Sequence, residues 1–200
     1  MPPAPREADL DAGGTAEQVP GEPGLWLLLL GDMTVFAALF GAFLVERRGD
    51  PALFATGADD LHAVIGLAAT MVLLTSSLAV AVAVRLHRSG SGEAGARAVG
   101  WALWCAAGFV VLKAVEWQAH LSLGHSPGEN PFWTFYFAIT GLHLVHLVIG
   151  SVLLLGVRSA MRRPAPPQDR RLLVESCTSY WHMVDLLWVL IFPLLYVTGT

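Results

Sequence analysis

Five apolar stretches, each long enough to cross a bilayer as a helix, constrain the fold of this chain more than any other feature. They cover residues 25–45, 62–86, 98–123, 132–157 and 173–198. A bilayer core of about 30 Å is spanned by roughly 20 apolar residues in a helix. The stretches are continuously apolar and do not alternate as the strands of a membrane barrel do. The sequence therefore predicts an all-α, polytopic membrane bundle of five transmembrane helices.

The composition agrees with a membrane protein. Hydrophobic residues make up 54% of the 200 positions and charged residues only 14%, with a mean hydropathy of +0.57, whereas soluble domains carry roughly 25% charged residues. The net charge of −4 gives no case for nucleic-acid binding, which needs basic contacts to phosphates. Cys105 and Cys177 are far apart and form no metal or redox motif, so we expect them to be packing residues.

The first 24 residues differ from the rest of the chain. Residues 1–24 are rich in Pro, Gly, Ala and acidic residues and carry a single Arg6. A secretory signal would begin with a basic stretch followed by a short apolar core. We therefore expect a disordered tail, with residues 25–200 forming one transmembrane domain.

Breaker residues separate the predicted spans. Residues 46–61 contain Pro51 and Gly57 and are expected to form a loop. Asn130 and Pro131 precede the fourth span, a pairing that favours a helix start.

The arginines in the connections predict the orientation of the bundle. Two arginines, Arg47 and Arg48, lie on one side of the predicted membrane. Nine lie on the other side: Arg6, Arg85, Arg88, Arg97, Arg158, Arg162, Arg163, Arg170 and Arg171. Because basic loops stay inside, the N-terminus is predicted to be cytoplasmic and the C-terminus outside.

Asp32 lies in the first predicted span, where a carboxylate needs an explanation. A charged, unpaired carboxylate at the bilayer centre costs about 2.5–3.5 kcal/mol on insertion scales. Two hypotheses stay open: a lipid-binding or proton-linked carboxylate, and a protonated acid that hydrogen-bonds a neighbouring helix.

Lys113 and Glu116 are three residues apart in the third span, so they share a helix face and can pair. They are interpreted either as a structural ion pair or as a contact to lipid or to a partner subunit, and Glu116 stays a candidate for lipid binding or proton linkage.

His143 and His146 are also three residues apart and share a face of the fourth span. Two such histidines bind a metal only if further ligands converge, and His182 and Glu116 are conceivable ones. Bundles that build carboxylate–histidine sites use Glu-x-x-His pairs, and no Glu precedes either histidine by three. We therefore assign no metal site and expect hydrogen bonds to other helices, with both histidines kept as lipid-binding or proton-linked candidates.

His182 and Asp185 in the fifth span are three residues apart as well. An Asp that accepts from a His N–H is a stable buried arrangement, so we expect a structural pair. The aromatic residues near span ends are expected to be interfacial anchors, namely Trp101, Trp104, Trp117 and Trp133.

Two polar strings in the last two spans resemble subunit III of the haem–copper oxidases, the cytochrome c oxidase type. In the fourth span the matching residues are Phe135, Tyr136, Thr140, Gly141, His143, His146 and Gly150. In the fifth they are Glu175, Tyr180, Trp181, His182, Val184, Asp185 and Trp188.

This resemblance implies an accessory subunit in a bacterial plasma membrane. Haem and copper then reside in partner subunits I and II, while subunit III binds the catalytic subunit, holds phospholipid and supports sustained turnover and proton uptake. The chain itself has no CxxCH haem motif and no copper-type cysteine pair, and no residue is assigned a catalytic role.

The chain departs from the family in two ways. Many members have seven helices, and the first two are lacking here. Gly31 and Asp32 stand where the family usually has a Ser-Glu pair, and the surrounding string is more like the branch associated with nitric oxide reductase. An accessory subunit of nitric oxide reductase is therefore an alternative, and an independent small membrane transporter or metalloprotein is another.

Overall fold

The computed structural model describes residues 23–163 and 168–197, and every element in these residues is helical. The elements are α1 (Pro23–Gly49), α2 (Pro51–Asp59), α3 (Ala63–Arg88), α4 (Gly92–Ser122), α5 (Pro131–Met161), α6 (Gln168–Phe192) and a π-helical turn, η2 (Pro193–Val197). Five helices, α1, α3, α4, α5 and α6 with η2, are long and apolar enough to cross a membrane. The predicted all-α bundle of five spans is confirmed. The disordered tail was predicted for residues 1–24. Residues 1–22 lie outside the described part, and α1 begins at Pro23.

The loop predicted for residues 46–61 is wrong, because α1 extends to Gly49 and α2 follows at once. Pro51 stands at the first position of α2, where its fixed φ favours a helix and its missing N–H is not needed. The Asp50 side chain accepts a hydrogen bond from the Leu53 N–H at 3.1 Å and caps this helix. Gly57 lies inside α2, where any Cβ would collide with the Phe132 ring of α5.

The start predicted for the fourth span is confirmed. The Asn130 side chain accepts a hydrogen bond from the Trp133 N–H at 3.0 Å, and Pro131 is the first residue of α5. The loop before it turns at Gly124 and Gly128, whose φ angles of 94° and 96° favour glycine.

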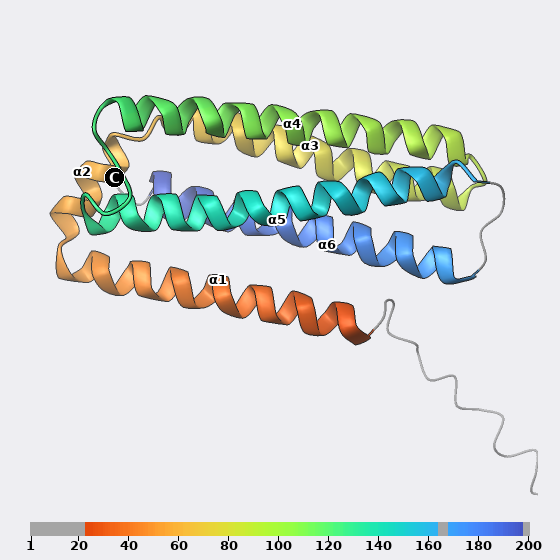
Figure 1. Cartoon of the computed structure of the whole chain (residues 1–200), viewed down its shortest axis with the longest axis horizontal. Helices are drawn as coiled ribbons and strands as arrows, with labels where there is room; N and C mark the ends of the chain where they lie inside the picture. The colour runs from red at the N-terminus through yellow and green to blue at the C-terminus, as the bar shows by residue number, and fades with distance from the viewer. Residues whose placement is uncertain (1–22, 164–167, 198–200) are drawn as a thin grey trace, which may run out of the picture.

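Figure 1 shows the arrangement of the long helices. α3 and α4 lie side by side, α5 and α6 lie beneath them, and α1 runs along the opposite edge, where it contacts α5 and α6. α2 crosses the end of the bundle that also holds the α4–α5 loop and η2. The α3–α4 turn and the end of α5 lie at the other end.

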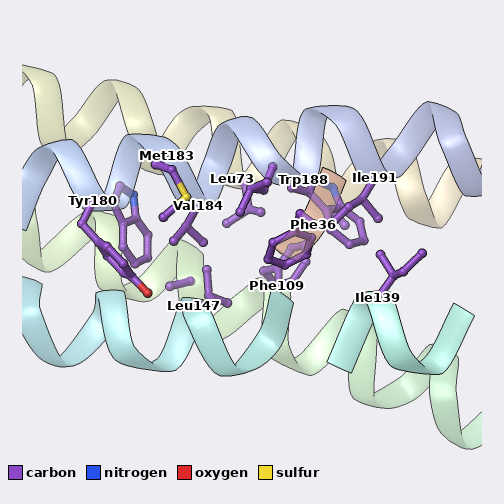
Figure 2. Packing of buried hydrophobic residues seen from close by; sticks show 14 of the residues in the cluster. Phe36, Leu73, Phe109, Ile139, Leu147, Tyr180, Met183, Val184, Trp188 and Ile191 are labelled. Carbon is purple, nitrogen blue, oxygen red and sulfur yellow. The ribbon is translucent and has the colours of Figure 1, made fainter. Parts of the chain in front are cut away.

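Large aromatic and aliphatic side chains fill the core between these helices. Phe109 packs edge-on against Trp188, with ring centroids 4.7 Å apart. Figure 2 shows Phe109 and Trp188 among the buried side chains of this core. Trp133 is buried as well, so the prediction that it is an interfacial anchor is wrong, whereas Trp101 and Trp104 are exposed.

Candidate functional site

A buried ion pair lies within α4. The Lys113 Nζ donates to Glu116 Oε2 at 3.0 Å, and the side chains are 0% and 2% exposed. The three-residue spacing places both groups on one helix face, as the sequence indicated. The pair faces the inside of the bundle, away from lipid.

Two tyrosines complete this pair, and sequence reasoning gave neither of them a role. Lys113 Nζ also donates to the hydroxyl oxygens of Tyr136 on α5, at 3.2 Å, and Tyr196 on η2, at 2.8 Å. Both hydroxyls in turn donate to Glu116 Oε1. All three protons of the ammonium group therefore have acceptors, and both carboxylate oxygens have donors. We call these four residues the lysine network.

Three aromatic rings surround the charge of Lys113. Its Nζ lies 5.0 Å from the ring centre of Tyr136, 5.2 Å from that of Trp188 and 5.5 Å from that of Tyr196. These distances allow cation–π attraction, which is stronger away from water. The lysine network thus links α4, α5 and η2 in one satisfied polar cluster.

Asp32 and His146 form a second contact, between α1 and α5. His146 Nε2 lies 3.3 Å from Asp32 Oδ1, and the side chains are 11% and 24% exposed. Sequence reasoning singled out both residues but did not pair them, since their contact depends on how α1 rotates against α5. The Phe36 and His146 rings pack in a T-shaped arrangement, with centroids 5.4 Å apart.

The second ring nitrogen of His146 bonds to its own helix. His146 Nδ1 lies 2.8 Å from the Leu142 carbonyl oxygen, which only accepts, so Nδ1 carries a proton. His146 Nε2 is therefore the nitrogen that faces the Asp32 carboxyl group. This polar partner on α5 helps to explain how a carboxyl group is tolerated in the apolar helix α1.

His143 does not make the expected hydrogen bond to another helix. Its ring is fully buried beside Phe109 and Trp188, and neither ring nitrogen has a hydrogen-bond partner among the described residues. His143 faces α4 and α6, whereas His146 faces α1, so the two rings do not converge on one point. In the described ranges, 23–163 and 168–197, no group of three or more His, Cys, Asp or Glu could hold a metal ion.

The expected pairing of His182 with Asp185 is not formed. His182 Nδ1 instead lies 2.7 Å from the hydroxyl of Ser77 on α3. Both carboxyl oxygens of Asp185 are buried without a hydrogen-bond partner in the described residues. The three-residue spacing puts both groups on one side of α6, but the imidazole turns outward to the neighbouring helix. A second hydrogen bond joins the same two helices, because Trp188 Nε1 on α6 donates to Thr70 Oγ1 on α3 at 3.0 Å.

The family model for cytochrome c oxidase subunit III matches residues 20–200, which include all five spans. The chain belongs to this family. It is 30% identical over 203 residues to cytochrome c oxidase subunit 3 of Bacillus subtilis strain 168, covering 92% of this chain and 95% of the relative. It is 29% identical over 184 residues to quinol oxidase subunit 3 of Bacillus spizizenii, covering 88% and 86%. The resemblance seen in the sequence is confirmed.

In this subunit III chain the polar residues inside the spans mainly join helices. Asp32 and His146 join α1 to α5, the lysine network joins α4, α5 and η2, and Ser77 with His182 joins α3 to α6. A polar bond between two helices fixes their rotation and depth relative to each other, because an apolar bilayer offers no other partner. The described residues are thus arranged to hold a precise bundle shape, which is the property that a docking subunit requires.

Proposed function

We propose that this chain is the non-redox accessory subunit III of a haem–copper oxidase in a bacterial plasma membrane. In this role it stabilises the catalytic subunit and binds phospholipid. The observation that carries the proposal is the family match over residues 20–200, together with a bundle in which several central polar groups are engaged between helices. Haem and copper belong, in this proposal, to the partner subunits I and II.

The proposal covers oxidases of either donor class. The relatives of this chain carry the names of both cytochrome c and quinol oxidase subunits. Because the electron donor is oxidised by the partner subunits, the same accessory role serves either donor.

The proposed orientation places the N-terminus in the cytoplasm. The described arginines at the end with the α3–α4 turn are Arg85, Arg88, Arg97, Arg158, Arg162, Arg163, Arg170 and Arg171. The opposite end carries Arg47 and Arg48. This asymmetry favours the arginine-rich end as the cytoplasmic end.

Asp32 and His146 are the candidates we retain for lipid binding or proton linkage within the family role. They contact each other and are partly exposed, so a headgroup or water can approach them. Glu116 and His143 are buried inside the bundle, which favours a structural role for both.

Purification of the intact complex tests the proposal. A C-terminally tagged chain is extracted from native membranes in mild detergent, and its optical spectrum and subunit masses are recorded. We expect oxidase haem bands together with subunits I and II. Haem b and c bands with a nitric oxide reductase core would establish that alternative. A colourless, solitary chain would contradict both and favour an independent transporter.

A further inference from the structure

Arg158, near the end of α5, lacks the partner that neighbouring arginines have. Arg88 pairs with Glu175 at 2.8 Å, and Arg162 lies 3.8 Å from Glu93. Arg158 makes no ion pair within the described residues, and its buried Nε has no hydrogen-bond acceptor there. A buried donor without an acceptor is unfavourable and rare. Because this donor is part of a charged group, its lack of an acceptor indicates that an anion binds beside it.

The guanidinium group of Arg158 lies flat against α4 at Gly100. A Cβ built on Gly100 would lie 3.5 Å from Cζ, 3.6 Å from Nε and 3.6 Å from Nη2 of Arg158. Nearly equal distances to three atoms of a planar group mean that its face, not its edge, covers the glycine. The edge, which carries the N–H donors, therefore points along the surface between α4 and α5. A planar fork of this kind matches the oxygens of a phosphate.

The depth of this site is that of a phospholipid headgroup. Arg158 is three residues from the end of α5 at Met161, and Arg97 is five residues from the start of α4 at Gly92. At about 1.5 Å per residue, both lie within roughly 8 Å of the helix ends. Arg97 is exposed and lies one turn before Gly100 on α4. It adds a second positive charge at the same level.

Exposed apolar side chains continue from this level toward the middle of the membrane. Trp101 and Trp104 are 70% and 75% exposed and follow Arg97 at spacings of four and seven residues, so all three share one side of α4. Tryptophan is enriched at headgroup level. Val111 and Val115, both exposed, extend this side deeper along α4. A phosphate at the arginines and an acyl chain along this track together describe a phospholipid.

We propose that Arg158 and Arg97 bind the phosphate of an anionic phospholipid at the surface between α4 and α5. The inference deepens the lipid-binding part of the proposed function and rests on it. The site is separate from the Asp32–His146 pair, which faces α1. Basic sites between transmembrane helices at the cytoplasmic side are known to bind anionic headgroups. Here Gly100 provides the flat surface on which the guanidinium group is held.

Lipid retention by the purified complex tests the site. The complex, with this chain at full length, is reconstituted in nanodiscs of phosphatidylcholine with phosphatidylglycerol. The complex is then released from the nanodiscs, and the lipids that stay bound to it are counted by native mass spectrometry. We expect Arg158→Gln to lose one phosphatidylglycerol that the unchanged complex retains. Arg88→Gln is the matched control, because it removes an arginine from the same end whose charge is already paired with Glu175. Equal phosphatidylglycerol retention in the unchanged, Arg158→Gln and Arg88→Gln complexes would overturn the proposal.

Gly100→Val gives a second test in which the arginine charge is kept. The larger side chain displaces the guanidinium group from α4, and we expect the same lipid to be lost. Retention in both Gly100→Val and Arg158→Gln would again overturn the site. A parallel sample in phosphatidylcholine with added inorganic phosphate distinguishes the sources. A lipid ligand would be refuted if phosphate binding in this sample depends on Arg158 while no phosphatidylglycerol is retained in the first sample.

Failure of this site and failure of the proposed function give different results. If the tagged chain purifies without subunits I and II, the accessory role fails, while lipid retention by the chain still tests Arg158. If the complex is complete but phosphatidylglycerol retention does not depend on Arg158, only the site fails.

Discussion

Lys113 shows how a full positive charge is held inside an apolar bundle. Its ammonium group donates to one carboxylate and two tyrosine hydroxyls, and the carboxylate of Glu116 accepts from the same two tyrosines. Removing one member of a buried pair leaves an uncompensated charge, whereas removing both members does not. The stability of the network therefore depends on both charges being present or both being absent.

Lys113→Met should destabilise the protein by about 3 kcal/mol, because Glu116 keeps its charge without a cation. The double variant Lys113→Met/Glu116→Gln should recover much of that loss. Thermal denaturation of the purified complex in mild detergent measures both effects. A single variant as stable as the unchanged protein, or a double variant less stable than the single one, would refute an ion pair at this position.

Asp32→Asn keeps a polar side chain beside His146 and removes the carboxyl group. An asparagine amide can still donate to His146 Nε2, but it cannot take up or release a proton as a carboxyl group can. We expect normal assembly and a stability change below about 1 kcal/mol, in line with hydrogen bonds inside membranes. The lipid content or the durability of turnover should change, and these are measured by lipid analysis and by activity over repeated turnovers. Unchanged lipid and kinetics would remove any special role for the Asp32 carboxyl.

At the scale of helices, contacts between elements depend on a few positions where backbones approach closely. Gly150 on α5 faces Trp181 on α6, and a Cβ there would lie only 2.9 Å from a carbon of the indole ring. A buried tryptophan moves little in a packed core. Gly156, further along the same helix, has open space around its Cα.

Gly150→Ala should therefore destabilise the bundle by roughly 1–3 kcal/mol, the range typical of overpacking. Gly156→Ala is the matched control and should be neutral or stabilising by up to about 1 kcal/mol, since alanine favours helix over glycine. Melting temperatures of the two variants decide the matter, and equal shifts would mean that α5 and α6 do not meet at Gly150.

The α3–α6 contact makes a prediction about coupling. Ser77→Ala and His182→Ala remove the two ends of one hydrogen bond, so their effects should not add. A double-mutant cycle should give a coupling of roughly 1 kcal/mol, within the range measured inside membranes. Additive losses would show that the two side chains do not interact, and coupling of His182 to Asp185 instead would restore the pairing first expected from the sequence.

The sequence predicted features that depend on the chain locally. The five spans follow from apolar length, the α5 start from Asn130 and Pro131, and the Lys113–Glu116 contact from spacing along one helix. Contacts between helices were missed, because they depend on how the helices rotate and how deep they lie. Tyr196 is an example, since nothing near it in the sequence indicates that it meets Glu116, eighty residues earlier. The one available signal was that Tyr196 is a polar aromatic residue at the end of the last apolar stretch.

For the whole molecule, the distribution of side chains suits a subunit that supports others. Apolar residues cover much of the outside of the long helices, while the central polar groups are mostly paired between helices. α1 packs against α5 and α6 and leaves its remaining sides exposed. We therefore propose that this chain holds shape and lipid around redox chemistry that other subunits perform.

The most direct test removes the chain from its complex and compares the two preparations. The oxidase is purified with and without this subunit, and haem content, copper content and activity during prolonged turnover are measured. We expect unchanged haem and copper, a similar initial rate and faster loss of activity without the subunit. Loss of a haem or a copper together with this chain would contradict it.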